Sequence, residues 1–273
     1  MKKVIVAFDR TSFSQGAFDF VKKMNETEPV FLIGLFLPQA SLASTMSVAG
    51  NVYSSNESEL IEKEEALVKM NVKNFEQLCN QHKIEYRIQK DFEGDAVTEL
   101  KKETGFANLM VLGSETFFHP EYENICKEYL LEILHESACS VVLVPEIFEY
   151  PDNVILLYDG SVNSVFSIKE FSYLFPELTK RETLLIYVDQ SNDLAIPENI
   201  QIEELLTRTF SNITLLTLDF DPKKYLTTWL MEKKSSILVC GSYGRSELSM
   251  LFKKSFLQDV LMEHILPVFI SHK

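Results

Sequence analysis

An internal repeat is the sequence feature that most constrains this chain. Three apolar blocks of the first half recur in the second half in the same order, at shifts of 150, 128 and 127 residues. The pairs are VIVAFD at 4 and VILLYD at 154, VLGS at 111 and VCGS at 239, and SVVLV at 140 and PVFIS at 267. Blocks that recur in order indicate one structural unit used twice. We predict two domains, residues 1–148 and 149–273, joined by a linker around Pro145 and Pro151.

The fall in the shift from 150 to 128 places one length difference between the first and second blocks. The first copy carries extra residues there, including the small-residue-rich segment Pro38–Ser55. A connection of this length is long for a compact domain, so we expect a mobile flap or a loop that contacts a partner.

Within each half, short apolar runs alternate with stretches of helical period, as in βαβ units with a parallel sheet. We predict an α/β fold of two tandem open sheets, each with five parallel strands flanked by helices. Helices are expected at about Ser14–Met24 and Glu57–His82. The strands expected in the first copy are Val4–Phe8, Val30–Phe36, Ile84–Lys90, Leu109–Gly113 and Val141–Val144; those in the second are Val154–Tyr158, Thr183–Val188, Ile213–Leu218, Ile237–Cys240 and Val268–Ile270.

Charge and composition limit which binding partners and which cellular compartment we expect for this chain. The formal net charge is −14 and the pI is near 4.9, so nucleic acid and anionic membranes are not expected partners. The N-terminal apolar run meets Asp9 too early for a signal peptide, and no apolar stretch is long enough to span a bilayer. The four cysteines form no C-x-x-C pair. We expect a cytoplasmic protein.

Ligands of open parallel sheets bind beyond the carboxyl ends of the strands, where Asp9 and Asp159 follow the first strand of each copy. A carboxylate there can accept from ribose hydroxyls or an adenine amine. Asp is equally a common cap of the helix that follows. Both interpretations stay open for each residue.

A segment after the fourth strand of the second copy suits a phosphate. Gly241 and Gly244 allow backbone N–H groups to approach a polyphosphate closely. Ser255 lies three residues before Gln258, a capping-box spacing that predicts a helix N-terminus there, with Lys254 just before it. The alternative is an ordinary turn followed by solvated lysines.

The same segment, GSYGRSELSMLFKKS, resembles the universal stress protein signature G-x2-G-x9-G-[ST]. Gly241, Gly244 and Ser255 match it, whereas Lys254 stands where the third glycine is expected. The order of elements and EGDAVTELKKETGFANLMVLGS extend the resemblance over nearly the whole chain as a tandem pair. It implies a Rossmann-like fold of the adenine nucleotide alpha hydrolase kind and a role in survival under stress.

The resemblance also implies a nucleotide site in the second copy. Asp159 would face the nucleoside, the backbone around Val188 would face adenine, and Gly241, Gly244 and Ser255 would face the phosphates of ATP or another adenine nucleotide, with Arg245 nearby. Mg²⁺ is expected only together with ATP. Lys254 either blocks the close approach that glycine permits or offsets phosphate charge with its ammonium group.

The first copy departs further from the signature. Thr116 replaces the second glycine, Glu115 places a carboxylate inside the loop, and Cys126 and Lys127 stand at the final positions. Glu121 and Glu123 add further negative charge. We therefore expect the first copy to hold no triphosphate and to pack against the second as an intramolecular pseudo-dimer, with a further homodimer as an additional expectation.

Other sites are weaker. Cys79 with His82, and His135 with Cys139, lie at helical spacing, but two ligands do not make a metal site, and none is expected. No catalytic residue is predicted, because P-loop, zinc-protease and nucleophile-elbow motifs are absent. Slow ATP hydrolysis would need a water-activating group that the sequence does not reveal.

Two functions stay open: a nucleotide-responsive stress regulator, and an interaction protein of the same fold that acts without nucleotide.

Overall fold

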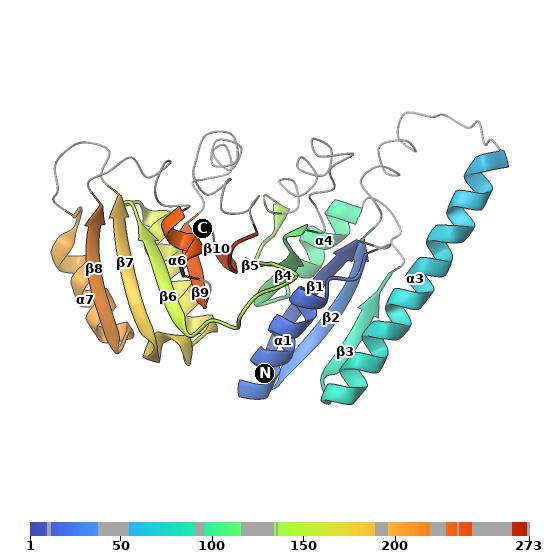
Figure 1. Cartoon of the computed structure of the whole chain (residues 1–273), viewed down its shortest axis with the longest axis horizontal. Helices are drawn as coiled ribbons and strands as arrows, with labels where there is room; N and C mark the ends of the chain where they lie inside the picture. Colours follow the sequence, from blue (N-terminus) through green and yellow to red (C-terminus); the bar gives the residue numbers. More distant parts are fainter. Residues whose placement is uncertain are drawn as a thin grey trace. The chain divides into compact units, whose positions relative to one another are not determined.

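The computed structural model divides the chain into two compact units, Met1–Cys139 and Ser140–Lys273, which we describe separately (Figure 1). The described residues are 1–9, 12–37, 55–90, 96–115, 134, 136–188, 196–218, 228–233, 235–241 and 264–271. The segment expected to be a flap, Pro38–Ser55, lies outside this part of the chain up to residue 54.

The first unit contains a parallel sheet in the order β3-β2-β1-β4. Its central strands, β1, β2 and β4, are apolar and buried on both faces, as in sheets covered by helices on both sides. Its elements are β1 (Lys2–Asp9), α1 (Gln15–Thr27), β2 (Val30–Leu37), α3 (Ser55–His82), β3 (Glu85–Gln89), α4 (Ala96–Thr104) and β4 (Leu109–Gly113).

A cluster of aromatic rings fills the core of the first unit. Phe8 of β1 stacks on Phe36 of β2 at 5.2 Å, and Phe75 of α3 meets both rings edge-on. Gly34 makes room for this arrangement, because a Cβ there would lie 2.7 Å from the Phe75 ring. The single glycine of β2 therefore fixes where the long helix α3 crosses the sheet.

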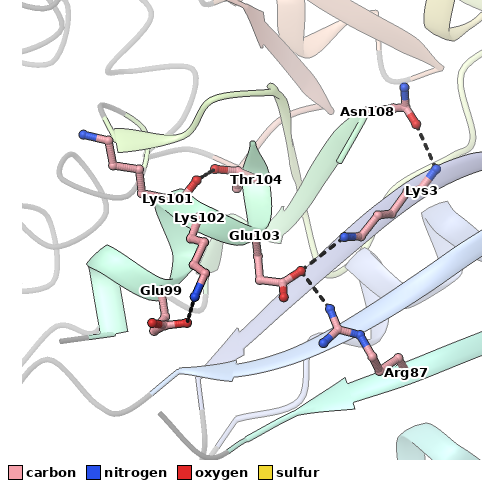
Figure 2. A network of polar contacts seen from close by, with 8 residues as sticks. All are labelled: Lys3, Arg87, Glu99, Lys101, Lys102, Glu103, Thr104 and Asn108. Atoms are coloured by element: carbon pink, nitrogen blue, oxygen red, sulfur yellow. Dashed lines mark hydrogen bonds and ion pairs between the residues drawn. The ribbon is translucent and has the colours of Figure 1, made fainter. Parts of the chain in front are cut away.

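A polar network joins three elements of the first unit (Figure 2). The Glu103 carboxylate on α4 accepts from Lys3 Nζ of β1 at 3.2 Å and from Arg87 Nη2 of β3 at 2.8 Å. Burial favours a higher pKa for Glu103, but the hydrogen bonds from Arg87 and Lys3 outweigh it and hold the pKa below its usual value. Glu103 thus links α4 to two strands while it stays charged.

The second unit contains a parallel sheet in the order β10-β9-β6-β7-β8, to which β5 adds at the β10 edge. β5 runs antiparallel to β10, and the hydroxyls of Ser140 and Ser271 lie 2.9 Å apart. The elements are β5 (Ser140–Val144), β6 (Asn153–Tyr158), α6 (Val162–Leu174), η3 (Leu178–Lys180), β7 (Glu182–Val188), α7 (Asn199–Thr209), β8 (Asn212–Leu218), β9 (Ser236–Gly241) and β10 (Val268–Ser271).

All ten predicted strands are present, and the predicted α/β class with helix-flanked, mostly parallel sheets is confirmed. The prediction of five parallel strands in each copy is wrong for the first copy, because its fifth strand, β5, runs antiparallel to β10. The helices expected at Ser14–Met24 and Glu57–His82 are α1 and α3. The compact units divide at Cys139 and Ser140, whereas the repeat predicts domains that meet at residues 148 and 149. The difference has a physical cause, because β5 is hydrogen-bonded to β10 of the second unit.

The first helices of the two units, α1 and α6, follow the repeat in their buried positions but not in where they begin. Four buried positions of α1 recur in α6 at the shift of 150. They are Ala17, Phe18, Val21 and Met24 in α1, and Ser167, Ile168, Phe171 and Leu174 in α6. Yet α1 begins after its cap Ser14, whereas α6 begins after Ser161, about one turn earlier relative to the repeat. Relative to the repeat, α6 therefore has an extra turn at its N-terminal end, directly after β6, and ends about one turn earlier.

Candidate functional site

Three predicted site residues of the second unit meet at the carboxyl edge of its sheet. β6 lies between β9 and β7, with Leu156 in register with Val239 and Tyr158 in register with Tyr187. Continuing these registers places Gly241 level with Tyr158, and Val188 level with Asp159. Neighbouring strands lie about 5 Å apart. The fold thus brings Asp159, Val188 and Gly241 to one place, where open α/β sheets bind ligands.

The Asp159 carboxylate is half-buried and takes part in the turn that follows β6. Its Oδ1 atom accepts from the backbone N–H of Ser161 at 2.9 Å. Ser161 is itself the cap of α6, because its hydroxyl accepts from the Ser164 N–H at 3.1 Å. The capping alternative is therefore wrong for Asp159 itself: the cap of α6 is Ser161, and Asp159 orders this cap residue.

Contacts with Pro197 also hold the turn after β6. Gly160 has a φ of +80°, which favours glycine, and a Cβ there would lie 2.9 Å from the Pro197 ring. The Tyr158 hydroxyl donates to the Pro197 carbonyl at 2.9 Å. Pro197 thereby joins the start of α7 to the end of β6.

Gly241 has a packing role that the sequence does not reveal. A Cβ on Gly241 would lie 2.5 Å from the Ser164 nitrogen and 2.6 Å from the Asn163 carbonyl carbon. The extra turn of α6 therefore lies directly on the end of β9. Because this contact already requires glycine, the presence of Gly241 is not by itself a sign of phosphate binding.

A buried hydrogen bond strengthens the same contact. The Ser167 hydroxyl of α6 donates to the Cys240 carbonyl at 2.8 Å. Burial, followed by the negative charge of Asp159, raises the pKa of the Cys240 thiol to about 12. Cys240 is therefore a neutral packing residue and not a nucleophile.

The remaining predicted phosphate ligands, Gly244, Arg245, Lys254 and Ser255, lie outside the described residues. In the first copy, Thr116, Glu121, Glu123, Cys126 and Lys127 also lie outside them, as does the side chain of Asp9. Glu115 is described: its carboxylate accepts from the Ser114 hydroxyl at 2.9 Å, directly after β4. The predictions that rest on the undescribed residues stay predictions.

Sequence reasoning missed a pocket between the N-terminal turns of α6 and α7. It has a volume of about 250 Å³ and is open on one side. Most of its lining is apolar. The described residues that line it are Tyr158, Gly160, Ser161, Val162, Val165, Glu198, Gln201, Ile202 and Leu205. The pocket exists only once two helices pack together, so no single stretch of sequence indicates it.

Metal ligation was the other possibility weighed from the sequence. Within the ranges that the structure describes, no three His, Cys, Asp or Glu side chains gather to hold a metal ion. Burial raises the pKa of Cys79 to about 12 and that of Cys139 to about 11, which disfavours the thiolate that a metal needs. His135 lies outside the described residues.

No helix in the described part of the chain is long and apolar enough to cross a bilayer.

Comparisons with known proteins identify solved structures that share this fold. A scan against models of protein families finds no match, and a sequence comparison with curated proteins finds none either. Among solved structures, the chain is similar to a universal stress protein from Archaeoglobus fulgidus, with a TM-score of 0.71, 14% identity, and 99% of this chain and 98% of that chain covered.

Two further solved structures are less similar. The cytoplasmic domain of a prokaryotic cation chloride cotransporter has a TM-score of 0.51 and 16% identity, and 98% of this chain and 94% of that chain are covered. A functionally unknown protein from Pseudomonas aeruginosa has a TM-score of 0.50 and 9% identity, with 100% and 92% covered. At such identities the likeness establishes the fold alone. Over its whole length, the chain has the fold of universal stress proteins, as the sequence resemblance implies.

Proposed function

We propose that this chain is a cytoplasmic stress-response protein whose second unit binds an adenine nucleotide, ATP or a relative, as a regulatory switch. One observation carries the proposal: the ends of β6, β7 and β9 bring Asp159, Val188 and Gly241 to one edge of the sheet, within one residue of the same level. A nucleotide there would have a carboxylate for its ribose hydroxyls, backbone groups of a strand end for adenine, and a glycine-bearing loop for its phosphates.

The phosphate end of this site rests on the loop that follows Gly241. There, Gly244 and Ser255 would supply backbone N–H groups, and Arg245 and Lys254 would supply positive charge, with Mg²⁺ bound only alongside ATP. In a chain of net charge −14, such local positive charge is needed to hold a triphosphate. The likeness in fold to a universal stress protein supports the stress role.

The first unit has a different proposed role. Glu115 places a negative charge directly after β4, where phosphates would lie. We assign this unit to packing with the second unit as an intramolecular pseudo-dimer, and a further homodimer of the whole chain belongs to the same proposal. Neither nucleic acid nor a membrane is an expected partner.

A second candidate function is an interaction protein that acts without nucleotide. The contact between Gly241 and Ser164 favours it, because packing alone accounts for the glycine that matches the signature. The fold also occurs as the cytoplasmic domain of a cation chloride cotransporter, so it is not confined to free-standing stress proteins.

The deciding experiment is to denature freshly purified protein and to identify released ATP, ADP or AMP by mass spectrometry. The first function predicts bound nucleotide, or a thermal shift when ATP and Mg²⁺ are added. Gly244→Glu should abolish either signal, whereas the matched change Thr116→Glu in the first copy should not. Absence of both signals from the unmodified chain would favour the nucleotide-independent function. Equal loss from both variants would mean that the site has been assigned to the wrong copy.

A further inference from the structure

The pocket between α6 and α7 has the features of a binding site separate from the proposed phosphate loop. Its walls are the side chains of Val165, Ile202 and Leu205, and the described residues that line it include neither Val188 nor Gly241. Its volume of about 250 Å³ is slightly below the usual range for drug-sized ligands. A pocket of this volume can hold one aromatic ring or a short branched aliphatic chain.

Apolar surface continues beyond the opening of the pocket. Val162 lines the pocket on α6 and is 69% exposed. Large aliphatic side chains this exposed leave apolar area in water. An apolar ligand would therefore gain contacts both inside the pocket and at its rim.

Glu198 stands at the pocket in an unusual conformation. Its φ of 49° and ψ of 40° lie in the left-handed region, and its side chain makes no capping hydrogen bond although it is the cap residue of α7. Glu is a poor cap, and the left-handed backbone conformation is strained for a residue other than glycine. The preceding Pro197 is held by Tyr158 and Gly160, so the surrounding structure keeps Glu198 in this position.

The charges around the opening sum to a negative value. The N-termini of α6 and α7 each contribute roughly half a positive charge. Glu198 lines the pocket, and Asp159 is the chain neighbour of the lining residues Tyr158 and Gly160 and acts electrostatically on Tyr158. Each contributes a full negative charge, and none of the described lining residues is a cation. Burial raises the pKa of Tyr158, and the charges of Glu198 and Asp159 raise it further. The two carboxylates outweigh the two helix ends by about one charge, which disfavours an anion and favours a cation.

We propose that this pocket binds a small organic cation, whose apolar part fills the space between Val165, Ile202 and Leu205 and whose positive group lies against Glu198. The pocket shares only the charge of Asp159 with the proposed nucleotide site, and the phosphate loop proposed there takes no part in it. Loss of nucleotide binding would leave it intact, and its own failure would not affect the nucleotide site.

The test compares three probes of the same shape on the full chain: phenethylammonium, phenethyl alcohol and phenylacetate. Binding is followed by backbone amide shifts in NMR titrations. We expect saturable shifts at Val165, Ile202 and Leu205, with phenethylammonium binding about tenfold more tightly than phenylacetate and the alcohol falling between them.

Two charge variants separate the pocket from the general attraction of an acidic protein for cations. Glu198→Gln should weaken phenethylammonium about fivefold and leave phenethyl alcohol unchanged. Glu203→Gln makes the same change in net charge on the same helix, but Glu203 is not among the described lining residues, so it should weaken the cation by less than about twofold.

A third variant tests the pocket itself. Val165→Phe should abolish the shifts for all three probes while the circular dichroism spectrum stays unchanged. Equal affinity for cation and anion, equal weakening by both glutamate variants, undiminished binding to a correctly folded Val165→Phe, or shifts confined to other residues would each overturn the proposal. So would the absence of saturable binding by any probe.

Discussion

Gly241 at the end of β9 lies so close to Ser164 in the first turn of α6 that a Cβ on the glycine would be 2.5 Å from the serine nitrogen. One contact thus joins the strand that leads into the proposed phosphate loop to the helix that follows Asp159. The extra turn of α6 makes this contact, and the repeat predicts no such turn.

Gly241→Ala is therefore expected to destabilise the second unit. The new methyl group would meet main-chain atoms, which cannot rotate away as a side chain can, so we expect a loss of about 1–3 kcal/mol in the free energy of unfolding. Trp229, the single tryptophan, reports the unfolding of this unit in urea. Gly105→Ala gives a milder clash for comparison, because its Cβ would lie 3.3 Å from the Lys102 carbonyl. We expect it to destabilise the first unit by less than Gly241→Ala destabilises the second, as followed by circular dichroism. An unchanged midpoint for Gly241→Ala would show that the contact is relaxed in solution.

Ser167→Ala tests the hydrogen bond that supports the same contact. The hydroxyl is fully buried and donates to the Cys240 carbonyl at 2.8 Å, so its loss should cost about 1–2 kcal/mol in urea unfolding followed by Trp229 fluorescence. Ser172→Ala on the same helix removes an exposed hydroxyl that bonds to the Lys169 carbonyl, and should change stability by less than about 0.5 kcal/mol. Equal effects of the two changes would argue against a special role for Ser167.

Glu103→Gln should destabilise the first unit in a pH-dependent way. The pKa of Glu103 is below its usual value in the folded chain, so its charge stabilises the fold above the unfolded pKa of about 4.3, and this stabilisation is lost as the pH falls through the lower folded value. We expect the variant to be about 1 kcal/mol less stable near pH 7, with the difference shrinking below about pH 4. The measurement is urea unfolding followed by circular dichroism at several pH values. A constant difference would mean that the charge of Glu103 contributes nothing.

Local patterns predicted the strands well, for a reason visible in particular residues. The runs from Val4 to Phe8 and from Val154 to Tyr158 are apolar and bounded by polar or charged residues, so their burial follows from composition. The pairing of β5 with β10 was not predictable in this way. Both strands are short and apolar, and nothing in SVVLV or VFIS specifies the neighbour or the direction.

The site was predicted in part. The position of Asp159 after the first strand and the glycine at 241 follow from motif spacing, and the fold brings them together. The packing of Gly241 on Ser164 depends on where α6 begins, which depends on the left-handed turn at Gly160.

Glu198→Gly should stabilise the second unit. Glycine adopts the left-handed conformation at little cost, so the change should raise the free energy of unfolding by about 0.5–1 kcal/mol while it removes the carboxylate at the pocket. Glu203→Gly, in the interior of the same helix, should instead lower it by about 1 kcal/mol. Urea unfolding followed by Trp229 fluorescence distinguishes the two. Destabilisation by both variants would show that Glu198 is not strained.

The most direct test of the nucleotide site is the affinity for ATP with Mg²⁺, measured by isothermal titration calorimetry on the unmodified chain, Asp159→Ala and Asp9→Ala. The two variants make the same change after the first strand of each copy. We predict one site per chain, weakened at least about tenfold by Asp159→Ala, which loses charge-assisted hydrogen bonds to the ribose, and unaffected by Asp9→Ala. No binding by the unmodified chain, or equal affinity in all three proteins, would contradict a nucleotide site in the second unit.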